Sequence, residues 1–168
     1  MSSDASVPAE SQDDEDLEAS RRWATASGRP VRVLAVDDHA TNRLVLQGIC
    51  ELLDFECELA CDGEEALKAM QTGAYDLVLM DICMPGMDGV ETTCAIRELG
   101  GKAASTPIIA VTANPEGDAG DGPQRYFAAG MCAVVQKPVR IEQLTRAIFQ
   151  ALSDRPPQGA MLGRALDG

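Results

Sequence analysis

The sequence predicts an α/β fold, a doubly wound, five-stranded parallel sheet with helices on both faces. The chain has 168 residues, the length of one ordinary domain with room for short tails. Short apolar runs alternate along it with longer segments whose apolar residues recur at helical spacing. This alternation is typical of parallel sheets, because the connection between two parallel strands usually contains a helix. The crossovers are expected to be right-handed.

Five short apolar runs are the expected strands. The first follows Pro30 and ends before Asp37, and most of its residues are aliphatic. Apolar runs of four to eight residues between polar residues are typical of buried strands. The expected strands are residues 31–36, 56–61, 75–80, 107–111 and 133–136.

The segments between these runs are the expected helices. In the first, the residues at helical spacing are Leu44, Val45, Leu46, Ile49, Leu52 and Leu53. Asp88 is a suitable N-cap for the third helix, and the last helix is stopped by Pro156 and Pro157. The expected helices are residues 41–54, 63–71, 88–99, a short one before Gly130, and 141–152.

Three parts are expected along the chain. Residues 1–29 form an acidic N-terminal extension that is predicted to be disordered, and its alternative role is a docking segment for a partner. Residues 30–153 form the domain. Residues 154–168 form a short flexible C-terminal tail, too short to be a second domain.

Composition excludes several classes of protein. The net charge of −13 repels phosphate backbones, so no nucleic-acid partner is expected. No apolar run approaches the roughly 20 residues that span a bilayer, and the N-terminus lacks a secretory signal. We therefore expect a cytoplasmic protein without membrane insertion. Six cysteines match no zinc-binding spacing and are expected to be small buried residues.

Polar side chains follow four of the expected strands. They are Asp37 and Asp38, Asp81, Thr112, and Lys137. Because the carboxyl ends of parallel strands meet at one edge of a sheet, these groups are expected to converge there. Three neighbouring carboxylates raise one another's pKa values, and a lysine and a divalent cation such as Mg²⁺ relieve that repulsion. Such a site suits phosphoryl transfer onto a carboxylate.

These segments resemble the receiver domain of two-component response regulators. Residues 33–39 (VLAVDDH) resemble its first strand and acidic pair, and residues 77–89 (LVLMDICMPGMDG) resemble the strand and loop of its phosphorylated aspartate. Residues 108–113 (IIAVTA) and 136–138 (QKP) resemble its switch-threonine strand and its lysine-proline pair. The resemblance spans about residues 31–152, is nearest to receivers of hybrid histidine kinases and phosphorelays, and implies a flavodoxin-like receiver fold.

The resemblance implies a role for each residue near the acidic pair. Asp81 would be the phosphorylated nucleophile. Asp38, Asp81 and the backbone carbonyl of Cys83 would bind Mg²⁺, with Mn²⁺ as the alternative, and Asp37 would act mainly through water. Lys137 would pair with Asp81 and then with the phosphoryl group. The only histidine, His39, is expected to be a loop residue near the mouth of the site, and its alternative roles are a metal ligand and a phosphohistidine.

The resemblance also implies a conformational switch. Thr112 would move toward the phosphoryl group, Ala113 would leave room for it, and the peptide bond before Pro138 would be cis. The family often has an aromatic residue three positions before the lysine, where this chain has Val134, so its switching is expected to differ. The Gly- and Pro-rich segment 114–123 predicts a flexible loop and a shortened fourth helix.

The predicted function is that of a stand-alone response regulator receiver. It would take a phosphoryl group from a histidine kinase or a histidine phosphotransfer protein and signal through protein contacts. It would catalyse only its own phosphorylation and dephosphorylation. Alternatives are a phosphorelay shuttle, a phosphate sink, and a pseudo-receiver that acts without phosphorylation. A phosphatase is disfavoured because Cys83 occupies the position where such enzymes usually need a second carboxylate.

Overall fold

The computed structural model describes residues 15, 18, 28–117 and 122–154. Most of the expected acidic extension, nearly all of the expected tail and the middle of segment 114–123 lie outside the described residues. The predictions made for those parts therefore remain predictions.

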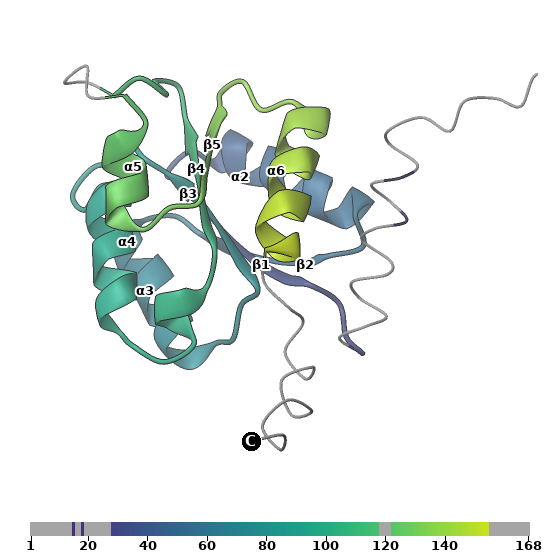
Figure 1. Cartoon of the computed structure of the whole chain (residues 1–168), viewed down its shortest axis with the longest axis horizontal. Coiled ribbons are helices and arrows are strands. Elements are labelled where there is room, and N and C mark those ends of the chain that lie inside the picture. Colours follow the sequence, from purple (N-terminus) through teal and green to yellow (C-terminus); the bar gives the residue numbers. More distant parts are fainter. Residues whose placement is uncertain (1–14, 16–17, 19–27, 118–121, 155–168) are drawn as a thin grey trace, which may run out of the picture.

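A single five-stranded sheet forms the centre of the described body, and all four strand pairs are parallel. The spatial order is β2-β1-β3-β4-β5 (Figure 1). The strands are β1 (Arg32–Val36), β2 (Glu56–Ala60), β3 (Leu77–Asp81), β4 (Ile108–Thr112) and β5 (Ala133–Gln136). The predicted fold class is confirmed, and each strand lies within two residues of its expected bounds.

Within residues 28–117 and 122–154, four helices and one short 3₁₀ turn connect these strands, and a fifth helix follows the last strand. They are α2 (Ala40–Leu52), α3 (Gly63–Thr72), α4 (Gly89–Glu98), the 3₁₀ turn η1 (Ala103–Ser105), α5 (Gln124–Ala129) and α6 (Ile141–Ser153). Asp88 caps α4 as predicted, and it forms a reciprocal capping box with Glu91. Helix α5 has six residues, which confirms the expectation of a short helix before Gly130.

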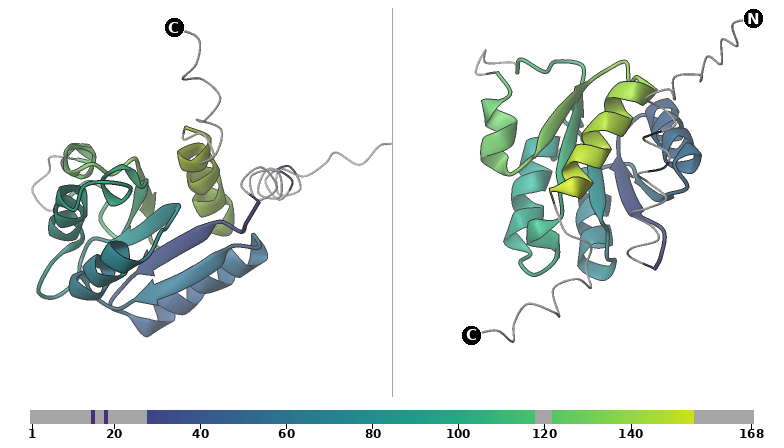
Figure 2. Two further views of the ribbon diagram at one scale, coloured as in Figure 1. Left: turned by 90° about the horizontal axis from the view of Figure 1, so that it is seen from below. Right: turned by 45° about the vertical axis from the view of Figure 1, so that its right-hand side comes forward.

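Helices cover both faces of the sheet (Figure 2). Alternate residues of each strand point to opposite faces, so Val33 and Ala35 of β1 join the core with α2 and α6. Leu34 and Val36 of the same strand join the other core, which includes residues of α3, α4 and α5. Burial on both faces explains why these strands are continuous apolar runs instead of alternating ones.

Helix α2 buries fewer apolar residues than its sequence suggests. Leu46 and Ile49 lie in the core, whereas Leu44 is 65% exposed and Leu52 is 61% exposed. The helix covers an edge of the sheet where only one of its faces contacts strands, so the apolar residues on its other face remain at the surface. Helical spacing alone does not show which part of a wide apolar stripe is buried.

The expectation for the cysteines is wrong for half of them. Cys50 is buried, but Cys83, Cys94 and Cys132 are exposed, because they lie in a loop or on the outer side of their segments.

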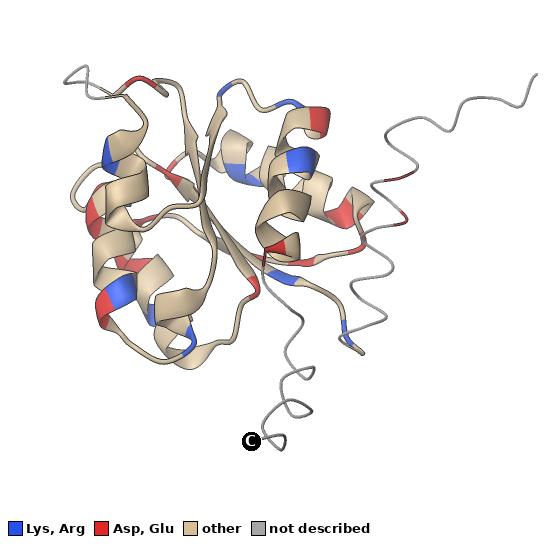
Figure 3. Ribbon diagram, viewed as in Figure 1, with Lys and Arg blue, Asp and Glu red and all other residues tan. Residues whose placement is uncertain are grey.

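Charged residues of both signs are distributed over the helices and strand ends (Figure 3). Across the whole chain, 27 acidic residues outnumber 14 basic ones. In the part of the chain that the structure describes, no helix is long and apolar enough to cross a membrane.

Candidate functional site

The site lies at the carboxyl edge of the sheet. Asp37 directly follows β1, Asp81 is the last residue of β3, and Lys137 directly follows β5. The chain order of the strands reverses between β1 and β3, the position at which ligands bind in open α/β sheets. The sheet therefore brings together groups that are up to 100 residues apart in the sequence.

Lys137 connects two of the three carboxylates. Its Nζ donates hydrogen bonds to Asp37 Oδ2 at 2.9 Å and to Asp81 Oδ1 at 3.0 Å. Burial alone would lower the pKa of the Lys137 ammonium, but the two carboxylates outweigh burial and raise that pKa. Lys137 therefore stays charged between two buried acids.

Asp37 is fixed from several sides. The backbone N–H of His39 donates to its Oδ1 at 2.9 Å, and Asn42 Nδ2 donates to the same oxygen at 3.3 Å. Arg43 donates to the Asp37 carbonyl oxygen at 2.7 Å. Our sequence analysis gave Asn42 and Arg43 no role. Their position in the first turn of a helix that follows an acidic pair is a signal that could have indicated one.

Asp38 and His39 lie at the mouth of the site. His39 is the N-cap residue of α2, and its side chain is 71% exposed. Its Nδ1 lies 2.9 Å from Asp38 Oδ1. Potential ligand atoms of Asp37, Asp38 and His39 lie within 4.8 Å of one another. Oxygen and imidazole nitrogen atoms so arranged can hold a divalent cation, and carboxylate oxygen is the ligand type that Mg²⁺ prefers.

Asp81 is the most perturbed acid of the site. Burial raises the pKa of Asp81 to about 6, the nearby Asp37 and Asp38 add to the rise, and Lys137 opposes it. Its Oδ2 is buried and accepts no hydrogen bond from any described residue. A buried carboxylate oxygen without a donor is costly unless a cation or a reacting group occupies the space beside it. The residues present therefore fit a divalent cation.

Thr112 is buried, and its hydroxyl group is oriented toward Asn114. The backbone N–H of Asn114 donates to Thr112 Oγ1 at 3.1 Å, and the carbonyl oxygen of Asn114 accepts from Tyr126 Oη at 3.0 Å. Ala113, the residue between Thr112 and Asn114 in the chain, is exposed. Sequence analysis missed Tyr126, because it belongs to a short helix that is distant from every motif.

The remaining predicted residues border the site. Cys83 lies in the loop between β3 and α4 with an exposed side chain. Val134, in β5, is partly buried against the core that contains Tyr126. The peptide bond between Lys137 and Pro138 is cis.

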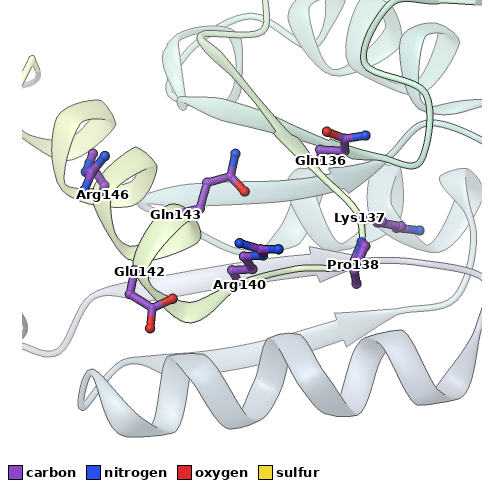
Figure 4. A pocket seen from close by; sticks show the side chains of 7 residues that line it. All are labelled: Gln136, Lys137, Pro138, Arg140, Glu142, Gln143 and Arg146. Carbon is purple, nitrogen blue, oxygen red and sulfur yellow. The ribbon is translucent and has the colours of Figure 1, made fainter.

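A polar cavity of about 660 Å³ lies next to the backbone of Lys137. The residues that line it come from the end of β5, the loop that follows it and the first half of α6, and they include Arg140, Gln143 and Arg146 (Figure 4). None of the three carboxylates of the site lines this cavity. It is therefore a neighbouring surface feature that does not belong to the carboxylate cluster.

The family model for the response regulator receiver domain matches residues 33–149. The match covers four strands in full, all of β1 except its first residue, and every residue of the site described above.

Curated relatives are much longer proteins. The sensor histidine kinase AruS of Pseudomonas aeruginosa is 42% identical over 132 residues, which are 78% of this chain and 13% of the kinase. The sensor histidine kinase RcsC of Salmonella typhi is 36% identical over 122 residues, which are 73% of this chain and 12% of the kinase. The chain thus spans about an eighth of the length of these relatives.

Solved structures of single domains match along nearly their whole length. The chemotaxis protein CheY4 of Vibrio cholerae gives a TM-score of 0.68 at 30% identity, with 73% of this chain and 99% of that chain covered. The receiver domain of a sensor histidine kinase of Pseudomonas aeruginosa gives a TM-score of 0.67 at 28% identity, with 74% and 98% covered. The latter structure has a magnesium ion coordinated in its active-site cleft.

Proposed function

Because the chain belongs to the family of response regulator receiver domains, we propose that it accepts a phosphoryl group on Asp81 in a reaction that needs a divalent cation. The family acts in two-component and phosphorelay signalling by phosphoryl acceptance, and this chain shares that function. The observation that carries the assignment to Asp81 is its buried Oδ2 without a hydrogen-bond donor, beside an Oδ1 that Lys137 holds.

The proposed cation is Mg²⁺, with Mn²⁺ as the alternative. Asp38, Asp81 and the backbone carbonyl of Cys83 would hold it, and Asp37 would contribute through water. The bound cation neutralises charge on the phosphoryl oxygens during transfer. The neighbouring acids of the site and the magnesium in the related Pseudomonas receiver support this proposal.

The protein groups have distinct roles in the proposed transfer. An oxygen of Asp81 attacks phosphorus in line, forming an acyl phosphate while the bond between phosphorus and the donor's imidazole nitrogen breaks. The Lys137 ammonium, which already contacts Asp81, stabilises the negative charge that accumulates. Thr112 then turns its hydroxyl toward the new phosphoryl group, and the small side chain of Ala113 leaves room for it.

The proposed phosphodonor is a phosphohistidine of a histidine kinase or of a histidine phosphotransfer protein. Related receivers belong to sensor histidine kinases, which supports such a donor. Output through protein contacts, as a relay or a phosphate sink, suits an acidic domain. We further propose that the protein acts in the cytoplasm and turns over no substrate apart from its own phosphoryl group.

Intact mass spectrometry after incubation with Mg²⁺ and acetyl phosphate tests the proposal. We expect the chain to gain one phosphoryl group, because Asp81 is positioned as the nucleophile. The gain should be absent in Asp81→Asn and in a sample whose metal is removed by a chelator. Asp154→Asn, an exposed carboxylate beyond α6, is the matched control and should be phosphorylated like the wild type.

Two outcomes would contradict the proposal. A phosphoryl gain in Asp81→Asn would place the modification on another residue. No gain from either acetyl phosphate or a phosphorylated histidine phosphotransfer protein would instead favour an interaction module that works without phosphorylation.

A further inference from the structure

The backbone of Asn114 lies between the side chains of Thr112 and Tyr126. Its N–H donates to Thr112 Oγ1 at 3.1 Å, and its carbonyl oxygen accepts from Tyr126 Oη at 3.0 Å. Thr112 is 1% exposed and Tyr126 is 2% exposed, so water does not compete freely for these bonds. A continuous path of hydrogen bonds therefore leads from the hydroxyl group at the end of β4 to a side chain of α5.

Tyr126 is the residue that attaches α5 to the core. It is the one buried residue among the six of this helix. Its ring belongs to the core cluster on the face of α3 and α4, and its carbonyl oxygen accepts from the Met131 N–H at 3.1 Å. A displacement of Tyr126 would therefore move α5 as a whole, since this short helix has no second buried anchor of its own.

The neighbouring strand offers no alternative connection of this kind. Val134 of β5 is partly buried, and its short aliphatic side chain has neither a ring nor a hydrogen-bonding group. In the described part of the chain, the Thr112 hydroxyl is connected to α5 by hydrogen bonds of the Asn114 backbone.

We propose that Tyr126 is a positioning residue that transmits the orientation of the Thr112 hydroxyl to α5 through the backbone of Asn114. This inference rests on the proposed phosphorylation of Asp81. It adds to that function the route by which the state of the site reaches the surface.

The different strengths of two hydrogen-bond acceptors explain why the Thr112 hydroxyl would turn away from Asn114 on phosphorylation. The Thr112 hydroxyl has one proton to donate, and in this structure it donates to the Asn114 carbonyl oxygen at 3.5 Å. That distance marks a weak bond. An anionic phosphoryl oxygen is a much stronger acceptor than a neutral carbonyl. When the hydroxyl turns toward it, the Asn114 N–H loses this acceptor, and the backbone of Asn114 shifts together with the Tyr126 hydroxyl that its carbonyl oxygen binds.

Hydrogen exchange with and without acetyl phosphate and Mg²⁺ tests the relay in wild type and in Tyr126→Phe. The variant removes one hydroxyl group and keeps the buried ring. Tyr75→Phe is the matched control, because Tyr75 is equally buried but packs at Arg32, at the other end of the sheet. The amide groups to follow are those of residues 114–117 and 122–130, and intact mass gives the phosphorylated fraction in each sample.

We expect all three proteins to be phosphorylated to the same extent. In wild type and Tyr75→Phe, phosphorylation should change exchange in residues 122–130. In Tyr126→Phe this change should fall about fivefold, the ratio that corresponds to one hydrogen bond of ordinary strength. An undiminished change in phosphorylated Tyr126→Phe would overturn the relay but leave the phosphorylation of Asp81 intact. Lack of phosphorylation in wild type would instead remove the proposed function and the relay with it.

A second measurement keeps the inference testable if Tyr126→Phe unfolds too readily for the exchange experiment. A double-mutant cycle with Thr112→Val, by urea unfolding without phosphodonor, measures the coupling between the two hydroxyl groups. The relay requires non-additive changes in the unfolding free energy, since both hydroxyls bind the backbone of the same residue, Asn114. Additive changes would contradict it.

Discussion

At the scale of single residues, the ionisation of Asp81 lowers the free energy of unfolding. Its pKa in the folded protein is about 6, which is higher than the value of about 3.9 for an unfolded aspartate. The folded state therefore favours the protonated acid, and the cost of ionisation grows as the pH rises from about 4 to about 6 and is full above that. Removing the charge in Asp81→Asn should raise the unfolding free energy by about 2 kcal/mol at pH 8 in metal-free buffer.

Urea unfolding at a series of pH values measures this effect. The difference in unfolding free energy between Asp81→Asn and wild type should shrink as the pH falls below about 6 and should vanish near pH 4. Asp154→Asn, at the exposed end of α6, is the matched control for the loss of one carboxylate. Addition of Mg²⁺ should stabilise wild type more than Asp81→Asn, because the cation would bind the native carboxylate. Equal stability of the two proteins at pH 8 would contradict the raised pKa.

The residues of the site were predictable from strand ends, but many of their contacts were not. Asp37, Asp81 and Lys137 converge because parallel strands end at one edge, which a pattern of apolar runs reveals. The orientation of Thr112 toward Asn114 depends on a side-chain rotamer and on a loop, and neither has a periodic signal in the sequence.

At the scale of elements, the start of α4 lies tightly against the end of β3. Gly89 is the first residue of α4, and its N–H donates to the Ile82 carbonyl oxygen at 2.9 Å. A Cβ atom at Gly89 would meet the carbonyl oxygen of Asp81 and would lie 2.8 Å from Ile82 Cα. Gly89→Ala should therefore lower the unfolding free energy by about 2 kcal/mol. It should also slow phosphorylation by acetyl phosphate, because the strain displaces the end of β3 that carries Asp81.

Gly48→Ala is the matched control for Gly89→Ala. Gly48 lies inside α2, and a Cβ atom there would have no atom within 4 Å. Alanine is a better helix former, so this variant should be more stable by about 0.5–1 kcal/mol, with phosphorylation unchanged. Urea unfolding and the rate of mass gain give both readouts. If Gly89→Ala matched Gly48→Ala in both, the close approach of α4 to β3 would not constrain the site.

The order and type of the elements followed from apolar periodicity, but the environment of each helix did not. Leu44 and Leu52 belong to the apolar stripe of α2 and yet lie at the surface. The width of the stripe predicts a helix, while the sheet edge beneath it decides how much of the stripe is buried. The length of α5 was correctly expected from its Gly- and Pro-rich approach, whereas the role of Tyr126 in attaching it depends on packing that spacing does not encode.

At the scale of the whole molecule, an ion pair that stabilises the fold and the proposed reactive carboxylate lie at opposite ends of the sheet. Asp76 directly precedes β3, and Asp81 ends it, so about 16 Å of strand separates them. Asp76 accepts two hydrogen bonds from the Arg29 guanidinium, at 2.8 and 2.9 Å, and one from the Arg32 N–H at 2.9 Å. Arg29 was the last residue of the expected N-terminal extension, and composition gave no sign of this contact.

Asp76 and Asp81 are therefore expected to respond to pH in opposite ways. Burial alone would raise the pKa of Asp76, but the hydrogen bonds from Arg29 and Arg32 outweigh burial and lower it. A lowered pKa contributes stability above the unfolded value of about 3.9, and this stability is lost as the pH falls through the folded value. Asp76→Asn should thus lower the unfolding free energy at pH 7 by about 2 kcal/mol, a moderate cost because Arg29 is partly exposed.

The loss of unfolding free energy in Asp76→Asn should diminish below about pH 4, where Asp76 of the unfolded wild type begins to take up a proton while the folded state still holds the charge. Phosphorylation of the folded variant by acetyl phosphate should stay at the wild-type rate, because the substitution is a full strand length from Asp81. Urea unfolding across pH and the rate of mass gain measure the two effects in one protein. A slower phosphorylation in fully folded Asp76→Asn would mean that β3 couples its two ends, and the separation of stability from chemistry along this strand would then be wrong.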